Sequence, residues 1–173
     1  MMDSKELDEL LEKTFSNVNS WLNFAEAKNA ANIAFVIACI AAIFSLENSN
    51  FLLYVLCFIL IISGVCSFWS FIPKLGDKMT GKRGAILTAG RINGDNLLFF
   101  ERIKEYSGTT YIKQICEMYF NDNNYKPTKY QLDLSNEIVY NSNNASRKYK
   151  IFRIAVHLDI IAFLLLVVFI ILA

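Results

Sequence analysis

Residues 51–72 read FLLYVLCFILIISGVCSFWSFI, an apolar run that contains no charged side chain. A helix needs about 20 mostly apolar residues to cross the hydrocarbon core of a bilayer, so this run is long enough to span a membrane. Two further apolar runs also lack Lys and Arg: Ala30–Leu46, at the short end of the range, and Ile154–Ala173. The sequence therefore predicts transmembrane helices at residues 30–46, 51–72 and 154–173.

The remaining sequence forms two polar segments, residues 1–29 and 73–153. The chain of 173 residues is 54% hydrophobic, which is too apolar for an ordinary soluble domain. Within the polar segments apolar residues recur at three- and four-residue steps, and no stretch alternates as a strand would. The predicted fold class is an all-α membrane protein with three transmembrane helices. Its helical cytoplasmic region combines the N-terminal helix extension with the segment between spans two and three.

The positions of glycine and proline predict where the long helices begin and end. Neither residue occurs in residues 3–46 or 128–173. We therefore expect one long helix to run from the cytoplasm into the first span, and another to run into the third span.

Two shorter helices are expected between the second and third spans. The first covers residues 95–106 and is followed by a break at Ser107 and Gly108. The second is capped by Thr109 or Thr110 and continues to residue 120, where an Asn- and Asp-rich turn follows.

The distribution of Lys and Arg predicts the orientation in the membrane. All 17 of these residues lie in residues 1–29 and 73–153, and none lies in the loop Glu47–Asn50. Basic loops face the cytoplasm, so the N-terminus and the central segment should be cytoplasmic. Three crossings that start inside must end outside, and Ala173 should lie on the outer side.

Catalytic and metal-binding patterns are not found in the sequence. The only histidine is His157, and Asp159, two residues later, falls on a different face of a helix. The four cysteines have no metal-ligand spacing. We therefore predict no catalytic residues, no metal site and no cofactor.

A glycine-rich segment after the second span carries basic residues that suit an anion. Gly76–Lys82 matches the first seven positions of a phosphate-binding P-loop, but Arg83 replaces the Ser or Thr that binds magnesium. These charges could contact the phosphates of a nucleotide or those of anionic lipid head groups. The candidate nucleotide-binding residues are Lys82, Arg83, Arg91, Arg147 and Lys148.

Small polar residues mark one face of the second span at spacings of four and three residues. Such a face either lets helices pack closely or lines a narrow path between subunits. An ionisable residue inside a span, such as Asp159, usually faces protein or water. Since three spans cannot enclose an aqueous path alone, a pore needs a homo-oligomer. The candidate pore-lining residues are Asn32, Ser63, Ser67, Ser70, His157 and Asp159.

Three sequence blocks resemble a known family. They are WLNFAEAKN at residues 21–29, NLLFF at residues 96–100 followed by Tyr111, and Asn141-Ser142 followed by ASRKY at residues 145–149. In this order, and between these apolar runs, they are similar to the Pycsar effector transmembrane domain family.

The resemblance implies a membrane effector of anti-phage defence in the bacterial inner membrane, with a periplasmic C-terminus. Such effectors act beside a partner nucleotidyltransferase, and their activation disrupts the membrane and stops growth. We expect no fused cyclic-nucleotide-binding domain, and in this respect the chain is similar to the stand-alone membrane effector of Hailong-type systems. The expected ligand is a cyclic mononucleotide or an oligonucleotide, and it either opens or closes the assembly.

These observations leave two main hypotheses for function. The first is a homo-oligomeric pore or ion channel in the lipid bilayer, with a tetramer as working assumption, that a nucleotide gates to depolarise the membrane. The second is a non-conducting anchor that recruits a soluble nucleotidyltransferase or another partner through the apolar residues Leu98, Phe99 and Phe100. The lack of a catalytic pattern disfavours a membrane-embedded enzyme.

Overall fold

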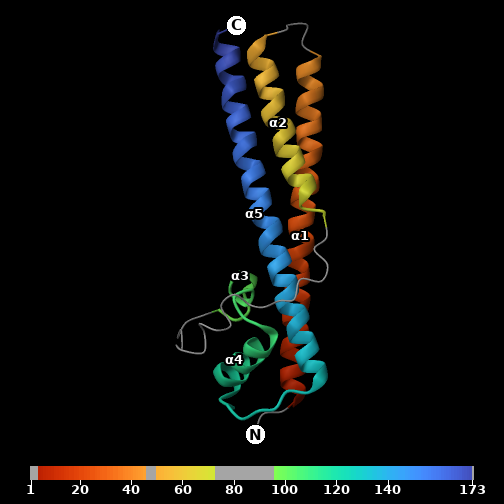
Figure 1. Cartoon of the computed structure of the whole chain (residues 1–173), viewed down its shortest axis with the longest axis vertical. Helices are drawn as coiled ribbons and strands as arrows, with labels where there is room; N and C mark the ends of the chain where they lie inside the picture. Colours follow the sequence, from red (N-terminus) through yellow and green to blue (C-terminus); the bar gives the residue numbers. More distant parts are fainter. Residues whose placement is uncertain (1–3, 46–49, 73–95, 173) are drawn as a thin grey trace. The chain divides into compact units, whose positions relative to one another are not determined.

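The computed structural model describes residues 4–45, 50–72 and 96–172, in which every regular element is a helix (Figure 1). Helices α1, α2 and α5 are each long and apolar enough to cross a membrane. The prediction of an all-α membrane protein is therefore confirmed. The helices are α1 (Ser4–Phe44), α2 (Phe51–Trp69), α3 (Phe100–Ile103), α4 (Gly108–Phe120) and α5 (Lys129–Leu172).

The two long helices have the extent that the sequence predicts. α1 has 41 residues and α5 has 44, and neither contains a glycine or proline that would interrupt its hydrogen bonds. The chain divides into two compact units to which both helices contribute. The first unit comprises Met1–Asn23 and Leu75–Ser146, and the second comprises Phe24–Lys74 and Arg147–Ala173.

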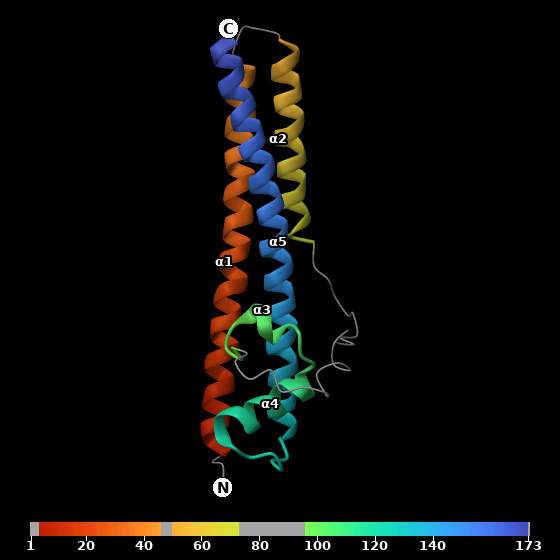
Figure 2. The same ribbon diagram turned by 90° about the vertical axis from the view of Figure 1, so that its left-hand side faces the viewer.

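The first unit packs the beginning of α1 and the beginning of α5 with the short helices α3 and α4 (Figures 1 and 2). Its core is apolar, and the aromatic rings of Trp21 and Phe100 lie 5.8 Å apart at its side. The Tyr111 hydroxyl donates a hydrogen bond to the Leu97 carbonyl at 2.8 Å, which ties α4 to the segment before α3. Buried core residues include Leu7, Leu11, Val18, Leu97, Ile103, Tyr111, Ile112, Ile115 and Ile138.

The start of α4 differs from the predicted one. Ser107 is the N-cap, because its hydroxyl accepts from the Thr110 backbone N–H while the Thr110 hydroxyl accepts from the Ser107 N–H. This reciprocal capping box makes Ser107 the start of the helix rather than a break. The expected cap by Thr109 or Thr110 was wrong, since Thr110 acts from the third helical position.

Gly108 brings the first turn of α4 into close contact with α5. A Cβ atom at this position would lie 2.1 Å from Asn136 Oδ1 and 2.9 Å from the Asn136 Cα. The Ser135 hydroxyl donates to the Gly108 carbonyl at 2.6 Å, in a fully buried position. Only a residue without a side chain fits between these atoms.

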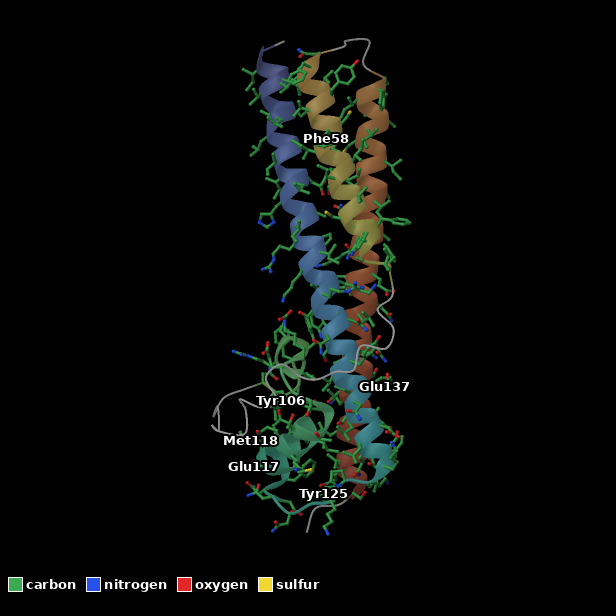
Figure 3. All side chains as sticks on the ribbon, in the orientation of Figure 1. Phe58, Tyr106, Glu117, Met118, Tyr125 and Glu137 are labelled. Atoms are coloured by element: carbon green, nitrogen blue, oxygen red, sulfur yellow. The ribbon has the colours of Figure 1, made fainter. Side chains whose placement is uncertain are left out.

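The second unit consists of the three membrane helices side by side, with α2 antiparallel to α1 and α5 (Figures 1 and 2). Large apolar side chains cover its outside, as at Phe58 of α2, which is 63% exposed (Figure 3). Inside, α1 and α2 pack closely, and a Cβ on Gly64 would lie 3.3 Å from Val36 Cγ1. Bulky residues toward lipid and small residues between helices are what a bundle in a membrane requires.

Substitution of Gly108 by Ala should destabilise the first unit. Because the nearest Asn136 atoms include the backbone Cα, the added methyl cannot be accommodated by a rotamer change alone. We expect a loss of about 1–3 kcal/mol, the usual range for overpacking. Chemical unfolding of the detergent-solubilised chain, followed by circular dichroism, measures this loss. The exposed substitution Lys113→Ala on the same helix serves as control, and equal stability of the two variants would contradict the assignment.

Cys116 of α4 should react slowly with alkylating reagents in the folded chain. Burial of the thiol, helped by the nearby Asp122 carboxylate, raises the pKa of Cys116 to about 11. The thiolate is the nucleophile, so alkylation should rise with pH toward that value rather than toward the ordinary value of 9.0. Because the folded state favours the neutral thiol, the contribution of this thiol to the free energy of unfolding is complete below pH 9. It is lost as the pH rises toward 11. Peptide mapping by mass spectrometry after timed alkylation reports this site separately; an unshifted profile would disprove the burial.

Candidate functional site within the membrane helices

The second unit contains a buried polar network that joins all three membrane helices. The Asn32 amide of α1 donates to the Ser63 hydroxyl at 3.1 Å and to the Ser67 hydroxyl at 3.0 Å, one turn apart on α2. The Ser63 hydroxyl in turn donates to the Ala155 carbonyl of α5 at 3.1 Å. Both serines are fully buried and Asn32 is 7% exposed. The sequence placed Ser63 and Ser67 on one face, and the structure supplies Asn32 as their partner.

Asp159 lies one turn after Ala155 on the same face of α5 and is half-buried. Its carboxyl group lies close to the Ser63 and Asn32 side chains. The Oδ1 atom is shielded from the surface and has no hydrogen-bond partner among the residues that the structure describes. Asn32, Ser63, Ser67 and Asp159 are called the membrane polar cluster from here on.

An apolar cluster fills the interior of the unit next to the membrane polar cluster. Its buried members are Val36, Leu56, Leu60 and Ala162. Val36 and Ala162 follow Asn32 and Asp159 by about one turn on α1 and α5, and Leu60 and Leu56 precede Ser63 by about one and two turns on the antiparallel α2. The interior of the unit thus changes from polar to apolar toward the end at which α2 begins. Ten residues form this packing, with Cys39, Ile40, Ile43, Ile59, Leu165 and Leu166 around the buried four.

Basic side chains of α5 donate hydrogen bonds to the carbonyls at the C-terminal end of α2. The last carbonyls of a helix have no partner within it, and they carry partial negative charge. Lys148 donates to the Ser70 carbonyl at 2.8 Å and pairs with the Glu26 carboxylate at 3.0 Å. Arg147 donates to the Ile72 carbonyl at 2.9 Å. Both candidate anion-binding residues of α5 therefore have an intramolecular role at this helix end.

Two residues of α1 that the sequence did not single out as site residues complete this end of the unit. The Asn29 amide donates to the Lys148 carbonyl at 3.3 Å and is fully buried. The Lys28 ammonium lies 4.6 Å from the ring centre of Phe24, 5.4 Å from that of Tyr149 and 5.5 Å from that of Phe152. The contacts of these residues with Lys148, Tyr149 and Phe152 join positions far apart in the chain, so no local spacing signals them.

The remaining predicted residues lie apart from the membrane polar cluster. Ser70 is buried at the end of α2, where its carbonyl accepts from Lys148. His157 is exposed, on the side of α5 away from Asp159, and its Nδ1 is 2.6 Å from the Arg153 carbonyl oxygen.

Three of the predicted nucleotide-binding residues lie outside the described residues: Lys82, Arg83 and Arg91. In the part of the chain that the structure describes, no group of three His, Cys, Asp or Glu side chains is arranged to hold a metal ion.

Three membrane-crossing helices, joined by polar side chains inside the bundle, define a polytopic helical membrane protein. The family comparison gives its class more closely: the chain belongs to the Pycsar effector family, whose Pycsar effector protein domain matches residues 10–173. It is therefore a membrane effector of anti-phage defence, and this membership favours an effector over an enzyme. Comparison with the curated proteins and with the solved structures finds no match.

Replacement of Lys148 by Met should lower stability in the absence of any nucleotide. The variant leaves the Glu26 carboxylate without its ion-pair partner and the Ser70 carbonyl without its closest donor. We expect a loss of about 1–3 kcal/mol, because a half-buried pair is broken. Thermal unfolding in detergent measures it, with the exposed Lys150→Met in the same turn as control. Identical melting temperatures for the two variants would show that Lys148 is not needed to hold α2.

Proposed function

We propose that the chain is a homo-oligomeric pore or ion channel of the bacterial inner membrane that a nucleotide or oligonucleotide gates. Its open state depolarises the membrane and arrests growth. The observation that carries this proposal is the membrane polar cluster, in which one carboxyl and three neutral polar side chains lie inside apolar spans.

Asp159 distinguishes a role of the membrane polar cluster in ion conduction from a role in helix packing alone. Hydrogen bonds between membrane helices can serve packing alone. Asn32 and the two serines already satisfy one another and the Ala155 carbonyl, so the bundle does not require a carboxylate. Because an ionisable group in a span costs about 2.5–3.5 kcal/mol on insertion scales, its presence supports a role with ions.

The three membrane helices of a single chain do not enclose a path for ions. The apolar cluster around Val36 and Leu60 fills the interior beyond Asp159. Conduction therefore requires several copies, for which a tetramer is the simplest symmetric assembly we propose, and a change in helix packing that brings the membrane polar cluster to the path.

The gating signal is proposed to act on the cytoplasmic region and to travel along α5. The Ser146 hydroxyl donates to Glu101 at 2.7 Å and accepts from the Lys104 ammonium at 2.7 Å, which ties it to α3 and the residue after it. The next residue, Arg147, holds the Ile72 carbonyl at the end of α2. Consecutive residues of one helix thus serve both units. Lys82, Arg83 and Arg91 remain the candidate nucleotide contacts, because Arg147 and Lys148 are already engaged.

The proposed orientation follows the positive-inside rule. Lys150 and Arg153 follow Arg147 and Lys148 within two turns of α5, and α1 carries Lys28 two residues after Glu26, the ion-pair partner of Lys148. This basic end would face the cytoplasm, and the C-terminus would face the periplasm.

Flux through liposomes that contain the full chain tests the proposal. With K⁺ trapped inside, we expect efflux either with or without members of a panel of cyclic mononucleotides and short oligonucleotides. Asp159→Asn should lower the efflux about tenfold, which corresponds to about 1.4 kcal/mol in the barrier. Tyr54→Phe, which removes a polar atom from the exposed face of α2, is the control. No efflux under any condition would exclude the channel.

The non-conducting anchor remains the second candidate because of one surface feature. Leu98 and Phe99 are 43% and 40% exposed, whereas Phe100 is buried. Two adjacent exposed apolar side chains before α3 suit contact with a soluble partner, such as a nucleotidyltransferase. Binding of such a partner to the same liposomes, without efflux, would favour this candidate, and Leu98→Ser should weaken the binding.

A further inference from the structure

We propose that the groove between α1 and α2 in the second unit binds an acyl chain of a membrane phospholipid whose head group is anionic. Such a site requires only that the three helices stand in a bilayer, so it goes beyond the proposed function and does not depend on conduction. Three features carry it: the shape of the groove, the medium around it and the charge at one of its ends.

The groove is a hollow of about 320 Å³ lined by eight apolar residues, all of them on α1 and α2. Its floor contains Val36, which is 3% exposed, and Gly64, which has no side chain. The side chains of Ile37, Val65 and Phe68 also line it, and each is more than half exposed. The floor is thus low and the walls are bulky, a shape that accepts a thin apolar group from the surrounding medium.

Hydrocarbon is the medium around this groove. Both α1 and α2 are long and apolar enough to cross a membrane, and the lining residues lie within the predicted spans at residues 30–46 and 51–72. A bound water needs polar partners, which an apolar lining does not offer. An empty hollow would forfeit dispersion contacts along its whole lining. The groove is therefore filled by an apolar group, either a lipid chain or part of a second copy.

The size of the groove favours a lipid chain over a helix of a second copy. Along α2 the lining runs from Ile61 to Trp69, a length of about 12 Å at 1.5 Å per residue. A helix with its side chains is about 10 Å across, so the same length of helix occupies about 900 Å³. The groove offers about a third of that volume, since it measures about 320 Å³. An extended acyl chain is a single file of methylene groups and fits such a narrow hollow.

The end of the groove at Trp69 determines the choice of head group. Arg147 donates to the Ile72 carbonyl at 2.9 Å, so its guanidinium group meets the chain three residues after Trp69. Lys148 is paired with Glu26, whereas Arg147 forms no ion pair with a carboxylate among the described residues. Hydrogen bonds to neutral carbonyls leave the Arg147 charge uncompensated, and it can attract the head group of an anionic lipid. Exposed tryptophan is also the side chain expected at head-group level.

Fluorescence of Trp69 tests the site in the full chain. The chain contains two tryptophans, and Trp21→Phe in the first unit leaves Trp69 as the sole one. This variant is reconstituted into phosphatidylcholine with a rising fraction of phospholipid that carries brominated acyl chains, because bromine quenches tryptophan on contact. We expect brominated phosphatidylglycerol to reach half-maximal quenching at about a fivefold lower fraction than brominated phosphatidylcholine, the preference that one basic residue gives an anionic lipid.

Two further substitutions in this background make the result specific. Val65→Phe should abolish the difference between the two lipids, because the added ring fills the groove. Ile154→Phe adds a ring at an exposed position of α5, beside Ala155, and should leave the difference unchanged.

The lipid site is ruled out if both lipids quench Trp69 equally before the further substitutions, or if Val65→Phe and Ile154→Phe behave alike. Quenching by neither lipid would show that a second copy covers the groove, and it would equally exclude the lipid. Because no flux is measured, none of these results decides whether the chain conducts.

Discussion

Polar groups within the hydrocarbon core of a membrane have no water to bind, and this constraint determines how the second unit is assembled. The Asn32 amide satisfies both of its hydrogens on α2, at Ser63 and Ser67. The Ser63 hydroxyl in turn donates a hydrogen bond to the Ala155 carbonyl on α5. Every one of these partners lies on another helix, so the three membrane helices can satisfy their polar groups only when they stand together in one register.

The same requirement explains the end of α2. Its last carbonyls would be left without donors, and they are satisfied by Arg147 and Lys148, which α5 presents in consecutive positions. Glu26 balances the Lys148 charge, so this contact adds little net charge at the membrane boundary. Basic residues near a membrane are often assigned to lipid or ligand on charge alone. Here two of them, Arg147 and Lys148, donate hydrogen bonds to the carbonyls at the end of α2.

The sequence predicted the two long helices well because their signals are local, whereas the short helix expected over residues 95–106 covers only Phe100–Ile103. An absence of glycine and proline, together with apolar length, predicts α1 and α5 nearly to their ends. The separation of His157 from Asp159 also follows from helical spacing alone. The capping box of Ser107 was misjudged, because a Ser-Gly pair indicates a break unless the contact of Gly108 with Asn136 is known.

The partners within the site were beyond sequence reasoning for a different reason. Asn29 with Lys148, and Asn32 with Ser63, are joined across long stretches of chain. The sequence grouped Asn32 with the serine face of α2, but it did not predict that the Asn32 amide would donate to both Ser63 and Ser67. Lys28 illustrates the same limit, since Phe24 is a neighbour in sequence whereas Tyr149 and Phe152 come from α5.

The packing of the second unit also defines what an opening transition must change. Gly64 and Val36 leave no space between α1 and α2, and Ala155 and Ala162 let α5 approach closely. Interiors packed at this density shift between discrete arrangements rather than deform gradually. In the proposed channel an open state therefore cannot be a slight widening of this bundle. It must exchange the contacts of the apolar cluster for contacts between copies, and the polar residues one turn away would then face a neighbouring chain instead of each other.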